Sequence, residues 1–92
     1  MSDEAAVNPE AQRALRRARS LAERLLRGEP LGEPIFETAM ELLDEHDEDL
    51  TPEARAFLDE LRFSFHELAT LRASAPRARV MERVVAAAAK LA

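Results

Sequence analysis

Two stretches with one shared pattern decide the fold: "NPEAQRAL" at residues 8–15 and "TPEARAFL" at residues 51–58. In each, a side chain that can cap a helix precedes a proline and then a glutamate. Proline suits the first helical position because its missing N–H is not needed there, and the helix dipole favours an acid in the first turn. Each stretch therefore predicts the start of a long helix.

Beyond these two starts, apolar residues recur at intervals of three and four, which indicates amphipathic helices. Gly28 is expected to end the first helix, and the segment "GEPLGEP" to turn the chain. The predicted helices span residues 9–27, 35–46, 52–73 and 76–91. No segment has the alternating pattern of a strand. The sequence predicts an all-α fold, an antiparallel four-helix bundle made of two αα-hairpins.

The junction "RASAPRA", residues 72–78, leaves part of the topology open. Pro76 either follows a tight turn and begins a new helix, or kinks one continuous helix. The turn is the preferred interpretation. A kink would join residues 52–91 into one rod that a monomer could not cover, so obligate dimerisation would follow.

A shift of 43 residues lays the two opening stretches on one another and superposes Leu15 on Leu58. One explanation is a duplicated helical hairpin with a period near that of HEAT-type units. The other is that capping residues and helical spacing produce such matches without common ancestry. Both explanations stay open at this point.

Length and composition indicate a single helical domain over residues 1–92, with residues 1–8 as a disordered N-terminal tail. The absence of cysteine excludes disulfides, thiolate zinc sites and thiol nucleophiles. The longest apolar run, residues 84–89, is far shorter than the roughly 20 residues of a membrane span, and residues 1–11 lack the apolar segment of a secretory signal. We therefore expect a cytoplasmic protein, and twelve arginines against one lysine favour a GC-rich bacterial or phage genome.

Six consecutive ionisable residues, 44–49, raise the question of a metal site. An EF-hand loop requires a glycine at its sixth position and a glutamate at its twelfth. Counted from Asp44, these positions hold Asp49 and Arg55. The run is therefore interpreted as a solvated connector between two helices.

The two histidines also lack the spacing of a known site. Di-iron bundles use Glu-x-x-His, but Leu43 stands three residues before His46 and Phe63 three before His66. His46 is interpreted as a histidine near the negative end of a helix. One hypothesis is nevertheless a metal-dependent or catalytic bundle around both histidines. The preferred prediction is a protein with no metal, no cofactor and no enzymatic activity. The sequence contains neither a glycine-rich phosphate loop nor a nucleophile elbow.

Charge is segregated along the chain. Residues 1–28 hold six arginines and four acids, whereas residues 29–53 hold ten acids and no lysine or arginine. On a helical wheel, the first helix presents an outer arginine face: Arg13, Arg16, Arg17, Arg24 and Arg27. The second presents an outer acidic face: Glu37, Glu41, Asp44, Glu45 and Glu48. These faces either pair within the molecule or serve a partner, and direct nucleic-acid binding is disfavoured by the net charge of −5.

The third predicted helix carries a second, thinner apolar stripe opposite its core face. The stripe consists of Ala56, Phe63 and Thr70 at seven-residue spacing, flanked by Asp59 and His66. This helix is also much longer than the second, so one neighbour cannot cover it fully. An uncovered apolar stripe is typical of a partner surface.

The sequence therefore favours a non-enzymatic protein–protein interaction or adaptor module that self-associates as a homodimer through this stripe. The alternative is an acidic inhibitor, of the immunity or antitoxin type, that neutralises a basic target through the second helix. The residues expected to carry that alternative are Glu41, Asp44, Glu45 and Glu48.

Overall fold

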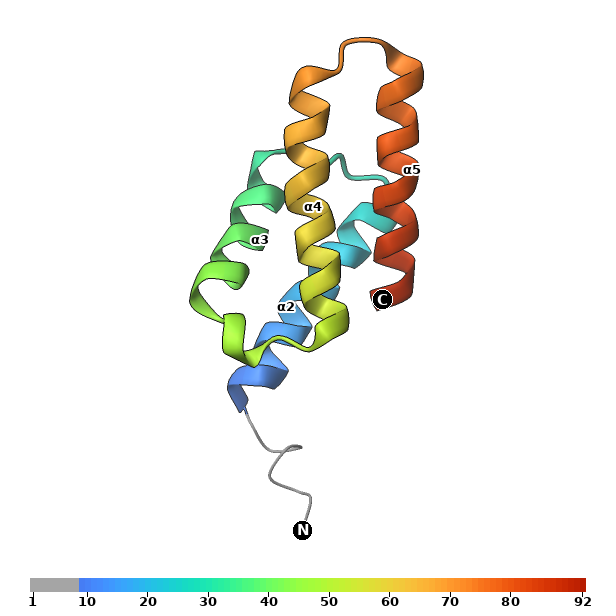
Figure 1. Cartoon of the computed structure of the whole chain (residues 1–92). Coiled ribbons are helices and arrows are strands. Elements are labelled where there is room, and N and C mark those ends of the chain that lie inside the picture. Colours follow the sequence, from blue (N-terminus) through green and yellow to red (C-terminus); the bar gives the residue numbers. More distant parts are fainter. Residues whose placement is uncertain (1–8) are drawn as a thin grey trace.

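The computed structural model describes residues 9–92, and the regular structure of this part of the chain is entirely helical (Figure 1). Its elements are α2 (Pro9–Leu26), α3 (Glu33–Glu45), the 3-10 turn η1 (Asp47–Asp49), α4 (Pro52–Thr70) and α5 (Ser74–Leu91). The all-α prediction is confirmed for these residues. The predicted tail at residues 1–8, with the cap expected at Asn8, lies outside the described residues.

Two of the predicted helix ends form as the sequence indicates. The Thr51 side chain accepts a hydrogen bond from the Ala54 N–H at 3.1 Å and so caps α4. At the end of α2, Gly28 adopts a φ of 101° and donates its N–H to the Leu25 carbonyl at 3.1 Å. Glycine tolerates this left-handed conformation without a steric cost, so it ends the helix cleanly.

The chain turns between α4 and α5, as preferred above. The break falls at residues 71–73, and Pro76 lies in the first turn of α5, where its missing N–H has no helical acceptor. Arg77 Nη1 donates to the Leu68 carbonyl at 2.6 Å and to the Leu71 carbonyl at 2.9 Å. Because these bonds cap α4, the helix ends three residues earlier than predicted. The kinked rod is excluded, and with it the argument for obligate dimerisation that rested on it.

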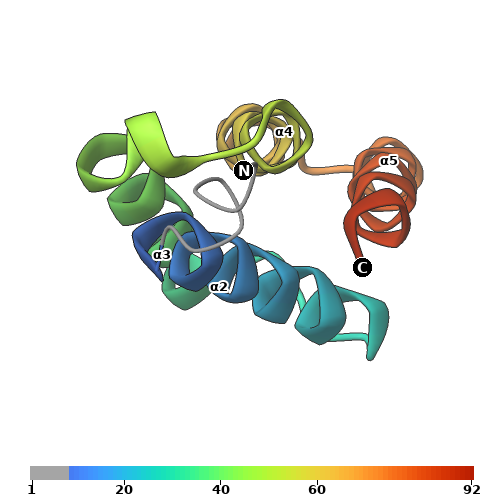
Figure 2. The ribbon, with the colours of Figure 1, turned by 90° about the horizontal axis from the view of Figure 1, so that it is seen from below.

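The helices pack as a bundle in which α4 lies between α3 and α5 (Figure 2). Helix α2 runs obliquely across the other side and packs more extensively on α5 than on α3, which follows it in sequence. A helix-packing core is therefore present, but α2 and α3 are not each other's main neighbours. The structure therefore confirms a bundle of helices, but it does not confirm the predicted pairing of these helices into two hairpins.

All four α-helices contribute to the core. Alanines on α2, α3, α4 and α5 are fully covered and let the helices approach closely. The largest fully buried apolar side chains are Leu21, Leu25, Ile35, Leu42, Leu58, Leu61 and Val84. Two aromatic residues at the edge of the core, Phe36 and Phe65, are only partly buried. They stack on one another at the boundary between α3 and α4, with ring centroids 4.1 Å apart.

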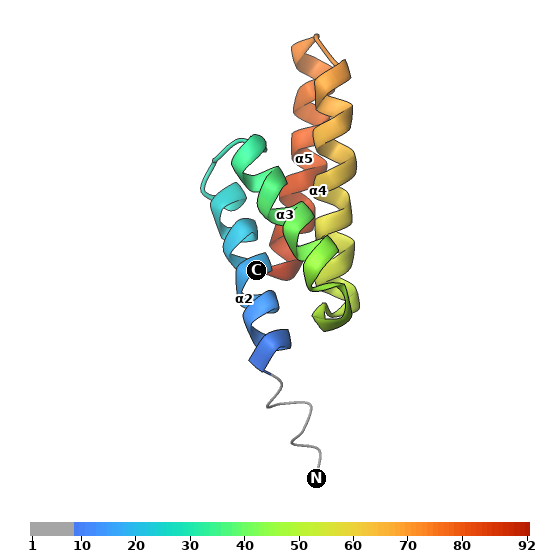
Figure 3. The same cartoon turned by 90° about the vertical axis from the view of Figure 1, so that its left-hand side faces the viewer.

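The connected ends of α4 and α5 project beyond α2 and α3 (Figures 1 and 3). We call residues 68–81 of this projection the tip. Among the described helices, none is long and apolar enough to cross a membrane.

Candidate functional site

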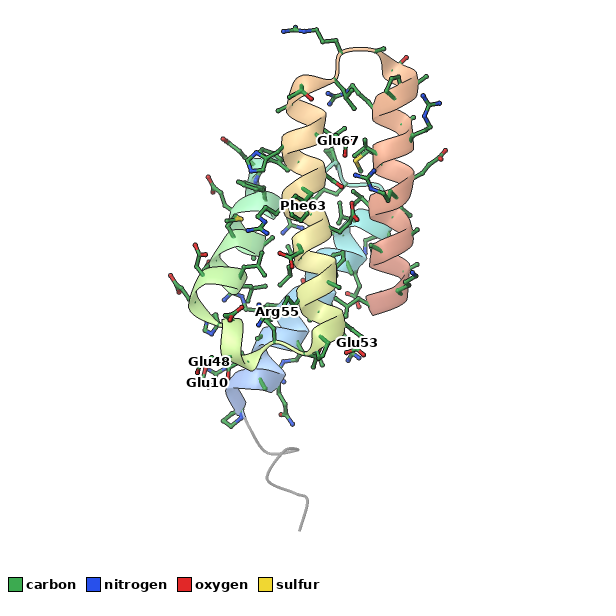
Figure 4. All side chains as sticks on the ribbon, viewed as in Figure 1. Glu10, Glu48, Glu53, Arg55, Phe63 and Glu67 are labelled. Atoms are coloured by element: carbon green, nitrogen blue, oxygen red, sulfur yellow. The ribbon has the colours of Figure 1, made fainter. Side chains whose placement is uncertain are left out.

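The outer face of α4 carries the most exposed large apolar side chain of the described residues. Phe63 is 60% exposed and lies midway along the helix (Figure 4). The guanidinium carbon of Arg62 lies 4.9 Å from the centre of its ring, within the range of a cation–π contact. Ala56 and Thr70 are exposed one heptad to either side. The predicted stripe is therefore present as a surface.

The two residues expected to flank Phe63 have different surroundings. Asp59 forms an ion pair with Arg62 at 3.2 Å, so the charges of both residues border the stripe. His66 turns toward α3, where its ring meets Phe36 edge-on with centroids 5.4 Å apart. His66 is exposed and belongs to an aromatic cluster with Phe36 and Phe65. The wheel could not show this cluster, because one of its members comes from another helix.

Ala56 also borders a shallow groove between α4 and α5. The groove has a volume of about 400 Å³, and its walls include Phe57, Ala86 and Ala87. Lys90 and Arg83 line it too. Small apolar side chains thus continue from the stripe toward α5.

The acidic face of α3 is only partly used inside the molecule. Glu41 forms an ion pair with Arg17 of α2 at 3.2 Å. Asp44 and Glu45 of α3 are exposed, and so is Glu48, which lies in η1 and not on the second helix as predicted. None of the three has an ion pair or hydrogen bond to another described side chain. Of the four acids assigned to the alternative function, three are therefore free to meet a partner.

The arginine face of α2 is largely paired. Arg24 donates to Glu29 through Nε at 3.0 Å and Nη2 at 2.5 Å, and these hydrogen bonds raise the pKa of Arg24. Arg13 pairs with Glu10 at 3.7 Å, and Arg27 with Glu23 at 3.8 Å. Within the described residues, Arg16 is the member of this face without an ion pair or hydrogen bond. Most arginines of this face are thus paired with neighbouring acids and are less available to bind an acidic partner.

A polar network that the sequence analysis missed joins α4 to α5. Arg83 Nε donates to Glu60 Oε2 at 2.8 Å, and Arg83 Nη2 donates to Glu67 Oε1 at 2.6 Å. Ser64, the buried polar residue of the described core, donates its hydroxyl to Glu60 at 2.5 Å. The spacing of Glu60, Ser64 and Glu67 by four and three residues places them on one side of α4. This spacing was visible in the sequence, but the arginine comes from the next helix.

The network changes the acid–base behaviour of its members. Burial alone would raise the pKa of Glu60, but hydrogen bonds from Ser64 and Arg83 outweigh burial and lower it. The hydrogen bonds to Glu67 and then to Glu60 raise the pKa of Arg83 above its usual value. Both partners are thereby held in their charged forms, which suits a structural tie between two helices.

The structure brings one possible group of metal ligands together. Oxygen or nitrogen atoms of Glu10, His46 and Asp49 lie within 4.8 Å of one another. Glu10, at the start of α2, is far from His46 and Asp49 in the chain, so the spacing of ligands in the sequence does not reveal it. His46 Nδ1 is 3.8 Å from Asp49 Oδ2, and Arg13 competes for Glu10 at 3.7 Å. The three side chains are partly exposed, and a metal ion would have to compete with these contacts for its ligands.

The remaining acid of the connector pairs with α4. Asp47 of η1 binds Arg55 through its carboxylate, and its carbonyl accepts a second bond from Arg55 at 2.8 Å. Arg55 is the residue that broke the EF-hand pattern, and here it fixes the connector to the following helix. The acidic run therefore joins two helices, as the sequence predicts.

No protein family, curated protein or solved structure matches the chain.

Proposed function

We propose that this protein is a non-enzymatic interaction module that forms a homodimer through the outer face of α4. The observation that carries the proposal is the 60% exposure of Phe63 in the middle of that face. Burying a phenylalanine side chain fully contributes about 1.5–3 kcal/mol, so its exposure in the monomer favours association.

The surroundings of Phe63 support a symmetric contact. Most homodimers use the same surface on both protomers, so each residue of the surface must tolerate its own copy or a near neighbour. A central phenylalanine can pack against its copy, and the small side chains of Ala56 and Thr70 leave room for the partner helix. Asp59 and Arg62 have opposite charges at the border and can exchange ion pairs across the two-fold axis. Intramolecular packing does not compete for this face, because Glu60 and Glu67 turn toward α5 and His66 toward α3.

The test is the molar mass in solution by light scattering. At micromolar concentration the protein should have about twice its chain mass of 10.3 kDa. Phe63→Asp should shift the mass toward that of one chain. Leu26→Asp is the matched control, since Leu26 is 43% exposed on α2, and it should leave the dimer intact. A monodisperse monomer for the unmodified protein would contradict the proposal.

The second candidate function is an acidic inhibitor that neutralises a basic target through α3. It is supported by the three unpaired acids Asp44, Glu45 and Glu48. An exposed acidic face accelerates association with a cationic target, and salt slows this association as the Debye length falls below about 10 Å. Neutralising Glu41 and these three acids should lower the association rate constant. Binding that is indifferent to both salt and these substitutions would reject the inhibitor.

We also propose that the four helices pair into two antiparallel αα-hairpins. The three-residue connection at residues 71–73 supports the pairing of α4 with α5. The duplication at a period of 43 residues stays a prediction, as do the cytoplasmic location and the bacterial origin.

A further inference from the structure

The tip carries a groove that none of the functions above uses. Two hollows of about 540 and 510 Å³ meet where the tip passes the connection between α2 and α3. Both are lined by Leu31, Leu68, Arg72 and Arg77. We propose that this groove binds an acidic amphipathic helix of a partner protein.

Apolar side chains from three segments of the chain form the floor of the groove. Leu31 comes from the connection after α2, Leu68 and Leu71 come from the end of α4, and Met81 comes from α5. Phe65, stacked on Phe36, borders the floor near α3. Below this level α2 and α3 cover α4 and α5, whereas the tip projects past them (Figures 1 and 3). One further helix of two or three turns, laid over the tip, would continue the bundle.

The rim of the groove determines the charge of its occupant. Residues 68–81 contain Arg72, Arg77 and Arg79 and no acid, although the whole chain has a net charge of −5. Arg72 is exposed, and within the described residues it has no ion pair or hydrogen bond. Arg77 uses one nitrogen to cap α4, and its guanidinium lines both hollows. An apolar floor beside the free guanidinium of Arg72 and that of Arg77 suits a helix whose apolar side chains are flanked by carboxylates.

Two other occupants fit less well. A second copy of the protein would offer the acidic face of α3, but Ile35, Ala39 and Leu42 of that helix are already buried in its own core. The acids of a second copy would match the arginines of the rim, but the copy would have no apolar side chains to cover the floor of the groove. Nucleic acid would use the arginines but not the leucines, and the net negative charge repels its phosphates.

The test uses a fluorescent 18-residue peptide with leucines along one face and glutamates beside them, titrated with the full-length protein. The peptide should bind, and binding should weaken when salt is raised. Two matched peptides serve as probes of specificity: one has lysine in place of each glutamate and the other has serine in place of each leucine. Neither should bind measurably.

Variants locate the binding site without touching the core. Arg72→Glu should weaken binding about tenfold or more, because the rim loses its free cation and gains a like charge. Ala69→Gln places a larger neutral side chain in the groove from an exposed position and should weaken binding similarly. Arg16→Glu on α2 is the control and should leave affinity unchanged, and Phe63→Asp is measured alongside it as the probe of the homodimer face. Unchanged thermal melting will show that each variant folds.

Four results would overturn the proposal. The first is equal binding of the glutamate and lysine peptides. The second is binding that survives both Arg72→Glu and Ala69→Gln. The third is loss of binding in Phe63→Asp, which would place the peptide on the homodimer face. A single-stranded oligonucleotide that binds more tightly than the acidic peptide would likewise assign the arginine rim to phosphates.

Discussion

The seam between α4 and α5 and the outer edge of α3 both carry carboxylates about one helical turn apart, yet the two regions differ in what meets those carboxylates. At the seam, Arg83 reaches across to Glu60 and Glu67 and ties the helices together. At the edge of α3, Asp44 and Glu45 meet no cation among the described residues. The comparison teaches that an acidic residue stabilises this fold where a neighbouring helix supplies an arginine, and is otherwise available for association.

The largest effect on stability should follow from removing an acid at the seam. Glu60→Ala deprives Ser64 and Arg83 of their shared acceptor. We expect the free energy of unfolding to fall by about 1–2 kcal/mol, a value reduced from that of buried charged hydrogen bonds because Arg83 is half-exposed. Urea denaturation measures this change. Glu37→Ala on α3 is the control and should change stability by no more than about 0.5 kcal/mol.

The same seam should make stability depend on pH. Because the folded state lowers the pKa of Glu60, the stability it contributes is present above the ordinary glutamate pKa and is lost as the pH falls through the lowered value. Between about pH 5 and pH 3 the unmodified protein should therefore lose more stability than Glu60→Gln. If the stability of the two proteins falls in parallel with pH, Glu60 does not form these hydrogen bonds in solution.

Neutralising the edge of α3 should have a smaller effect. A variant with Glu41, Glu45 and Glu48 changed to glutamine and Asp44 to asparagine loses one exposed ion pair, that between Glu41 and Arg17. Exposed pairs contribute about 0–1 kcal/mol, so the free energy of unfolding should change by no more than that. Thermal and urea unfolding measure it. A loss as large as that of Glu60→Ala would erase the distinction between the two regions.

Zinc should have the smallest effect. Tetrahedral zinc holds nitrogen and oxygen ligands at about 2.0–2.2 Å, so the group of Glu10, His46 and Asp49 would have to contract and release Arg13. Saturating zinc should therefore leave the melting temperature nearly unchanged. A bound metal at a hundred times its Kd would add about 2.7 kcal/mol. A clear rise that His46→Ala abolishes would establish a metal site instead.

The sequence predicts the elements of the fold well, because they depend on local chemistry. The Thr51 cap, the left-handed Gly28 and the helical periodicity act over a few residues, and each appears where expected. The end of α4 was misplaced because Arg77, nine residues after Leu68, caps the helix from the next element. A contact of this kind depends on how the chain turns, which the local pattern does not record.

The candidate surfaces also differ in whether they depend on one helix or on contacts between elements. A helical wheel is sufficient to place Phe63 on the outside of α4, since exposure there depends on one helix. Which charges remain free depends on neighbours: Asp47 and Glu41 are paired, whereas Asp44 is not. The tip groove needs three segments of the chain, so the sequence analysis did not identify it.

The most direct test of the homodimer face is isotope-filtered NMR on a mixture of labelled and unlabelled protein. Only contacts between different protomers give signals in this experiment. The proposed interface predicts contacts from the Phe63 ring of one protomer to the α4 surface of the other, including Ala56 and Thr70. A dimer whose intermolecular contacts avoid Phe63, or a sample without any such contacts at millimolar concentration, would contradict the account.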